Sequence, residues 1–83
     1  MTKKEIQLSI LNELKLSEKG KKVLKKFQKS IDSKEIITDV DFQTLAKIEA
    51  LEMFTKWGCQ CEFTSDDYKE IANLVVSLNN KIV

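Results

Sequence analysis

Apolar residues recur at helical spacing along four segments of this chain. The first two segments, residues 3–14 and 18–31, carry apolar residues three and four positions apart, which is the spacing of one face of a helix. In the first segment these residues are Ile6, Ile10, Leu11 and Leu14. In the second they are Val23, Leu24, Phe27 and Ile31. The pattern predicts two amphipathic helices, and Ser17 stands where a cap of the second helix is expected.

The third segment, residues 39–57, is the most apolar, and its apolar residues cover more than one face of a helix. Such a helix lies at the centre of a bundle or packs against a second subunit. One stripe along it, here called the central stripe, consists of Phe42, Ala46, Ala50, Met53 and Trp57. Its two alanines would let another helix approach closely. The stripe is therefore interpreted either as an oligomer interface or as part of the core.

The fourth segment, residues 65–80, has the alternating three- and four-residue spacing of a packing seam. The seam consists of Tyr68, Ile71, Val75, Leu78 and Ile82. It is too short for an independent coiled coil but long enough to pack on the preceding helix. The prediction is an all-α, four-helix single domain over residues 1–83, with a C-terminal antiparallel helical hairpin.

One six-residue pattern stands at the start of three of these helices. It reads large apolar, Thr, any, any, acid, large apolar, and occurs as MTKKEI (1–6), ITDVDF (37–42) and FTSDDY (63–68). A Thr at this position caps free backbone N–H groups, and the acid favours the positive end of the helix dipole. The pattern predicts Thr38 as the cap of the third helix, with Asp39 and Asp41 as first-turn acids. A metal site is not expected there, because hard cations need more oxygen ligands than two neighbouring carboxylates.

The composition agrees with a small helical domain. The chain has 83 residues, no proline and only two glycines, which favours helices over a sheet with tight turns. Gly58 is expected to end the third helix as a C′ glycine. No apolar run approaches the ~20 residues that span a bilayer, and no apolar segment follows the N-terminal lysines as in a secretory signal. We therefore expect a cytoplasmic protein.

Charge is distributed unevenly along the chain. Residues 1–34 hold ten lysines and four acids, a net charge of +6, whereas residues 35–83 hold four lysines and nine acids, a net charge of −5. A basic half suits phosphate and an acidic half suits a protein partner. Six lysines of the second helix, here called the lysine face, are Lys19, Lys21, Lys22, Lys25, Lys26 and Lys29. They are interpreted as DNA-binding residues or, alternatively, as an ordinary solvated face.

Base-specific readout is not indicated for this face. The chain contains no arginine, the residue that makes the commonest contact with guanine. Lysines would mainly contact phosphate and position the protein on the duplex.

Residues that could carry catalysis or hold a metal are few. The chain has no histidine, so no Ser or Cys can be paired with the usual base, and it has no glycine-rich phosphate loop. Cys59 and Cys61 are separated by one residue, whereas structural zinc needs four ligands and redox pairs are spaced C-x-x-C. We expect the two cysteines to pack in the link between the last two helices. The sequence predicts no cofactor and no enzymatic activity.

Two stretches combine these features in a particular order. LSEKGKKVLKKF (16–27) is a Leu-Ser-Glu opening followed by a basic amphipathic helix, and IITDVDFQTLAKIEALEMFTKWG (36–58) joins an Ile-Thr-x-x-Asp start to a Leu-rich helix and a glycine. The order resembles that of phage terminase small subunits. The matching positions are Leu16, Ser17, Glu18, Ile37, Thr38, Asp41, Leu45 and Gly58, and the two stretches cover about half of the chain.

The resemblance implies a non-enzymatic, oligomeric DNA-binding adaptor that recognises DNA for packaging and regulates the large motor subunit. Its partners would be double-stranded DNA, the large terminase subunit and further copies of itself, in the host cytoplasm. The alternative is a small helical inhibitor or immunity-type protein from a phage or a low-GC bacterium. That protein would present an acidic face to a basic partner. The residues of this face are Glu49, Glu52, Glu62, Asp66 and Asp67.

Overall fold

The computed structural model describes residues 1–58 and 63–82, and the described residues form four α-helices and no named strand. The helices are α1 (Lys3–Leu11), α2 (Glu18–Ser30), α3 (Val40–Gly58) and α4 (Ser65–Asn79). The predicted all-α fold is confirmed. Cys59 and Cys61 lie outside the described residues, as does Glu62. No helix in the described part is long and apolar enough to cross a membrane.

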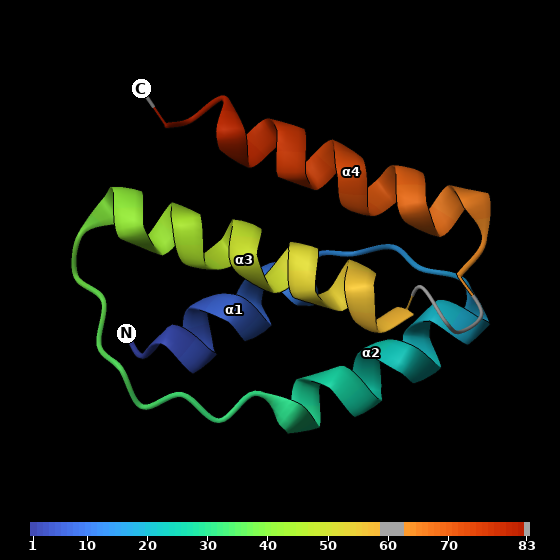
Figure 1. Cartoon of the computed structure of the whole chain (residues 1–83), viewed down its shortest axis with the longest axis horizontal. Coiled ribbons are helices and arrows are strands. Elements are labelled where there is room, and N and C mark those ends of the chain that lie inside the picture. Colours follow the sequence, from blue (N-terminus) through green and yellow to red (C-terminus); the bar gives the residue numbers. More distant parts are fainter. Residues whose placement is uncertain (59–62, 83) are drawn as a thin grey trace.

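The longest helix, α3, is at the centre of the fold. It contacts each of the other three helices, and in Figure 1 it lies between α4 on one side and α1 and α2 on the other. In the same view α3 runs from left to right and α4 returns from right to left. These three neighbours account for the buried apolar residues of the helix, which are Ala46, Ile48, Ala50, Leu51 and Phe54.

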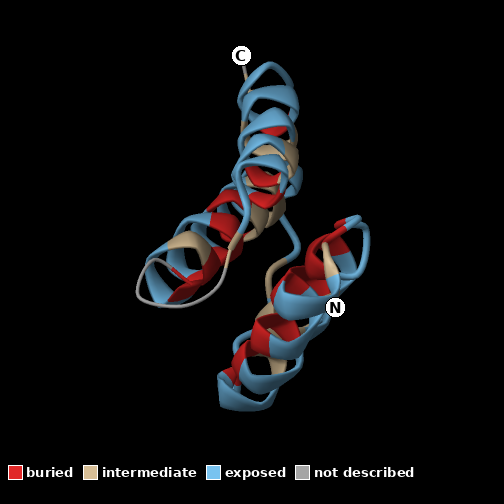
Figure 2. Cartoon of the chain, turned by 90° about the vertical axis from the view of Figure 1, so that its right-hand side faces the viewer, coloured by how far each residue is buried: buried red, intermediate tan, exposed pale blue. Residues whose placement is uncertain are grey.

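The apolar faces predicted for the first two helices are buried. Ile6, Ile10 and Leu11 are at most 3% exposed, and Phe27 is 2% exposed. On α3 the centre of the core is Leu51, which is fully buried. Figure 2 shows the buried residues (red) along the sides of the helices that face one another, with exposed residues (pale blue) on the outer sides. Burial of these faces is the main force that holds the helices together.

A chain of aromatic rings joins α2, α3 and α4. The ring centroid of Phe27 lies 5.4 Å from that of Phe54 and 5.3 Å from that of Trp57. Phe63 lies 5.0 Å from Phe54 and 5.5 Å from Tyr68, both edge to face. Each such pair contributes about 0.5–1.5 kcal/mol beyond its buried area. The rings therefore fix α2 and the start of α4 on the C-terminal half of α3.

Side-chain caps start all four helices, three of them as predicted. Thr2 accepts a 3.2 Å hydrogen bond from the backbone N–H of Glu5, and Ser17 accepts one of 3.2 Å from Gly20. Thr64 and Asp67 form a reciprocal capping box, in which each side chain accepts a hydrogen bond from the other residue's backbone N–H. These local arrangements follow directly from the sequence pattern.

The predicted cap of α3 is wrong. Asp39, not Thr38, accepts from the backbone N–H groups of Asp41 (2.9 Å) and Phe42 (3.2 Å), and the helix begins at Val40. A carboxylate is a stronger acceptor than a hydroxyl and also interacts favourably with the positive end of the helix dipole. The acid therefore takes the capping position and Thr38 stays outside the helix.

Gly58 ends α3, but not through a left-handed backbone as expected. Its φ is not positive. A Cβ placed on Gly58 would overlap the ring of Phe63. Glycine at this position therefore leaves space for an aromatic ring of the core.

The N-terminus is hydrogen-bonded to residues 35–37 of the connector between α2 and α3. The backbone N–H of Lys3 donates to the carbonyl of Glu35 (2.6 Å), and that of Ile37 donates to the carbonyl of Met1 (3.3 Å). Thr2 and Ile36 form an isolated antiparallel bridge between these bonds. This short pairing holds the chain leaving α2 against the start of α1.

Candidate nucleic-acid interface

The lysine face lies on the outer side of α2. The buried side of this helix is formed by Gly20, Val23, Leu24 and Phe27. All six lysines of the lysine face are exposed. At 100° per residue, these lysines centre on the side of the helix opposite its buried side. The burial pattern thus presents one continuous basic surface to solvent.

This basic surface is not neutralised by neighbouring acids. α2 carries six lysines and a single acid, Glu18. None of the six lysines forms an ion pair with any residue in the described ranges, whereas Lys3 on α1 pairs with Glu49 at 3.3 Å. Unpaired ammonium groups on a helix are free to replace the counterions of a polyanion.

The helix that carries this face is held firmly at both ends. At its start, Ser17 caps α2 and also donates its backbone N–H and its hydroxyl to the carboxylate of Asp67, at 2.8 and 2.7 Å. Near its end, Phe27 packs between Phe54 and Trp57. The lysines therefore project from a helix whose position is fixed by the fold.

Among the described ionisable groups, Asp67 is the one most affected by the fold. It is 2% exposed, and its carboxylate accepts hydrogen bonds from Ser17 and from the backbone N–H of Thr64. Burial acts to raise the pKa of this carboxyl, but the hydrogen bonds from Ser17 and Thr64 outweigh burial and hold the pKa below its ordinary value. Asp67 is thus a structural anion that links the starts of α2 and α4.

A groove between α1 and α2 continues the lysine face and was missed by sequence reasoning. It has a volume of about 480 Å³ and is lined by Lys4, Leu8, Asn12, Lys25, Gln28 and Lys29. The side-chain amide of Gln28 donates a 2.8 Å hydrogen bond to Oδ1 of Asn12 across it. Lys4 lies on a different predicted helix from the lysine face, so only the packing of α1 on the fold brings it there.

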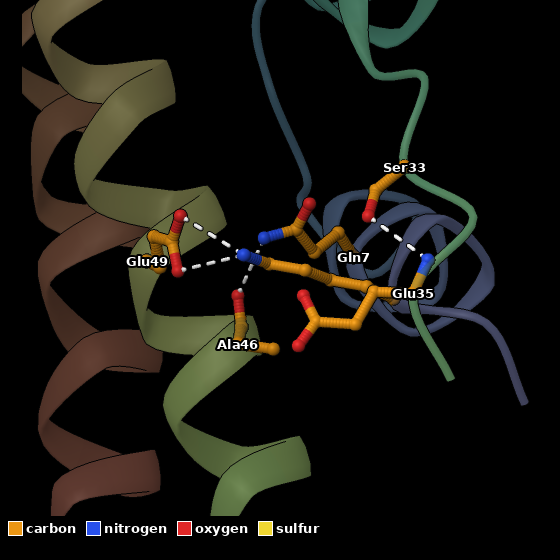
Figure 3. Close-up of polar contacts among 6 residues, drawn as sticks. Gln7, Ser33, Glu35, Ala46 and Glu49 are labelled. Carbon is orange, nitrogen blue, oxygen red and sulfur yellow. Dashed lines mark hydrogen bonds and ion pairs between the residues drawn. The ribbon is translucent and has the colours of Figure 1, made fainter. Parts of the chain in front are cut away.

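The structure divides the central stripe in two. Ala46 and Ala50 are 3% and 1% exposed, so they are covered by the chain itself and cannot face a second subunit as expected. Gln7 of α1 donates a 3.1 Å hydrogen bond to the carbonyl of Ala46, as Figure 3 shows. The small side chains thus serve close approach within the monomer.

The other members of the central stripe remain accessible. Phe42 is 62% exposed, Met53 46% and Trp57 47%, and Leu45 beside them is 46% exposed. This exposed apolar surface of α3 is interleaved with charged residues. An interface with another copy would therefore be made by these side chains.

The predicted acidic face is smaller than expected. Glu49 pairs with Lys3 across the α1–α3 contact, where Figure 3 shows its carboxylate pointing toward α1. Asp67 is buried and engaged with Ser17 and Thr64. Of the described members, only Glu52 and Asp66 are both exposed and without a described partner. Two of the five acids are thus used to hold the fold together.

The part of the chain that the structure describes contains no assembled set of metal ligands. No group of three or more Cys, Asp or Glu side chains is close enough there to hold an ion. Asp39 is occupied as a helix cap.

No protein-family model, no curated protein and no solved structure matches this chain. Its function is therefore inferred from its own residues.

Proposed function

We propose that this protein is a non-enzymatic DNA-binding adaptor that holds double-stranded DNA by its phosphate backbone. The observation that carries the proposal is the lysine face, six exposed lysines without a described ion pair on one side of α2. Lysine binds phosphate as a point charge and does not read sequence by itself. Binding would therefore be strong at low salt and largely independent of sequence.

The proposal extends to a role like that of a phage terminase small subunit. Two observations support it. In residues 16–58 a basic helix with a Leu-Ser-Glu opening precedes an apolar helix with an Ile-Thr-x-x-Asp opening. In addition, α3 carries exposed apolar side chains. In such a role the chain would oligomerise through Phe42, Met53 and Trp57 in the host cytoplasm. It would deliver DNA to a large motor subunit and regulate that subunit.

The test is the salt dependence of duplex binding, measured by fluorescence anisotropy with a labelled 20-base-pair DNA. Contacts from all six lysines predict a slope of about −5 in log K against log salt. The double variant Lys22→Glu with Lys26→Glu should flatten this slope by about 2 units or more. The matched control is Lys56→Glu with Lys69→Glu, which reverses two exposed lysines elsewhere. Equal binding by both double variants would refute the lysine face as the contact surface.

A second function, a protein-binding inhibitor, is favoured by a different surface. A groove of about 550 Å³ between α3 and α4 is lined by Glu52, Thr55, Lys56, Tyr68, Ile71, Ala72, Val75 and Val76. Its apolar side chains would accept one face of an amphipathic partner helix. This function predicts a chain that is monomeric and does not bind DNA. It also predicts a stoichiometric partner that is retained by the wild type and lost with Val76→Asp.

A further inference from the structure

We propose that the groove between α1 and α2 is a phosphate-binding site. It binds consecutive phosphates of a nucleic acid that also contacts the lysine face. The inference rests on the proposed function and adds to it a second helix, a specific groove and three residues outside the lysine face. These residues are Lys4, Asn12 and Gln28. The ligand class is a chain of phosphate groups rather than a single small anion.

The charges around the groove favour an anion. Lys4, Lys25 and Lys29 line it from two helices, and no acid is among the residues that line it. None of the three lysine side chains makes an ion pair or a hydrogen bond with a residue in the described ranges. Three ammonium groups at one groove repel one another unless a ligand brings negative charge between them. A polyanion would relieve this repulsion.

Neutral groups of the groove add donors and fix its shape. The Gln28–Asn12 hydrogen bond crosses from α2 to the end of α1 and uses the side-chain oxygen Oδ1 of Asn12. The amide NH₂ of Asn12 has no partner among the described residues, so it can donate to a phosphate oxygen. Leu8 lies between the polar residues and is packed against the core. Its apolar side chain reduces local hydration and strengthens charge–charge attraction at the groove.

The groove is long enough for several phosphates. Lys4 and Leu8 lie on one ridge of α1, in line with the C-cap residue Asn12. The eight steps from Lys4 to Asn12 rise by roughly 12 Å along the helix. Phosphates of one DNA strand advance by about 3.4 Å per nucleotide along the duplex axis. Lys25 and Lys29 belong to both the groove and the lysine face. One strand could thus contact the groove and the outer side of α2 together.

Two matched pairs of variants test the groove by duplex binding across a salt series. Lys4→Gln removes a charge at the groove, and Lys15→Gln removes one exposed charge of the same basic half outside it. Asn12→Asp adds a carboxylate to the groove without a change of size, and Asn73→Asp does the same on the exposed surface of α4. Circular dichroism checks that all four variants keep their helical content.

The expected result is a larger effect of each groove variant. Lys4→Gln should flatten the salt slope by about 0.9, the value for one lost phosphate contact, and Asn12→Asp should weaken binding at low salt more than Asn73→Asp does. Equal losses within each pair would overturn the groove while leaving the proposed function standing. A wild-type protein that does not bind the duplex at low salt would overturn the proposed function.

Inorganic tripolyphosphate then distinguishes between two possible ligands of the groove, the phosphate backbone of a nucleic acid and a free polyphosphate. In ¹H–¹⁵N NMR spectra, the side-chain amide signals of Asn12 and Gln28 should shift on addition of the duplex and much less with tripolyphosphate. Shifts with tripolyphosphate and no binding of the duplex would assign the groove to a free polyphosphate instead. Signals that move with neither ligand would overturn the site for both sources.

Discussion

The hydroxyl of Ser17 donates a 2.7 Å hydrogen bond to Oδ2 of Asp67, fifty residues further along the chain. The backbone N–H of Ser17 adds a 2.8 Å bond to Oδ1 of the same carboxylate. Asp67 also accepts from Thr64 at the start of α4. One buried carboxylate therefore joins the caps of two helices, and it orients the basic helix α2 against the rest of the fold.

The first prediction concerns the pH dependence of stability. The pKa of Asp67 is lower in the folded protein than its ordinary value of 3.8. Its ionised form therefore stabilises the fold fully above that ordinary value, and the contribution is lost as the pH falls through the folded pKa. We expect Asp67→Asn to lower the free energy of unfolding by about 2 kcal/mol at neutral pH, the cost of weakened hydrogen bonds to a charged group.

Urea unfolding over a series of decreasing pH values measures this effect. The difference between wild type and Asp67→Asn should shrink toward acidic pH, because the protonated acid resembles the amide. Asp66→Asn is the control, since Asp66 is exposed in the same turn. A difference that is constant with pH, or equal in the two variants, would contradict the role given to Asp67.

The second prediction concerns Gly20. A Cβ at this position would lie 2.9 Å from Oδ2 of Asp67 and 3.1 Å from the Cβ of Leu16. Alanine in a helix is favoured over glycine by about 1 kcal/mol, but overpacking here costs about 1–3 kcal/mol. We expect Gly20→Ala to destabilise the protein in thermal and urea unfolding, despite its higher helix propensity. In an Asp67→Ala background the cost of Gly20→Ala should be smaller, because only the contact with Leu16 remains. A cost that is the same in both backgrounds would rule out the contact with Asp67.

The third prediction separates two residues at the start of α3. Asp39 accepts hydrogen bonds from two free N–H groups, whereas Thr38 precedes it outside the helix. Loss of an N-cap typically costs about 1 kcal/mol. We expect Asp39→Ala to lower the free energy of unfolding by about that amount and Thr38→Ala to change it little. The reverse order in urea unfolding would restore Thr38 as the cap.

The fourth prediction concerns self-association through α3. Phe42 is 62% exposed, so replacing it with aspartate should not disturb the monomer's core. We expect the wild type to show a mass of several subunits in size-exclusion chromatography with light scattering, and Phe42→Asp to reduce that mass. Val76→Asp is the control, since Val76 is 58% exposed on α4. A wild type that is monomeric at both low and high salt would remove the oligomer from the proposal.

Local interactions account for what could be predicted from this sequence. The periodicity of apolar residues located four helices and the buried faces of the first two, because a helix places residues three and four apart on one side. The caps at Thr2, Ser17 and Thr64 were also predictable, since a cap joins residues only three positions apart. At the start of α3 the predicted cap, Thr38, was wrong, because Asp39 takes the capping position.

Contacts outside the local helix account for the other two errors. Ala46 and Ala50 look like an interface in the sequence, but α1 comes to lie against α3, and Gln7 binds the carbonyl of Ala46. Gly58 looks like a C′ glycine, but the ring of Phe63 needs the space. Both of these residues have a partner that lies outside their own helix.

The sequence by itself therefore determined the helices, most of their starts and the concentration of lysine on α2, because these depend on neighbours within a few residues. Only the tertiary structure decided that Asp67 is a buried link rather than a surface acid. It also decided that Lys4 joins Lys25 and Lys29 at one groove. These pairings depend on how the helices pack, and packing is set by the simultaneous burial of apolar faces from the whole chain.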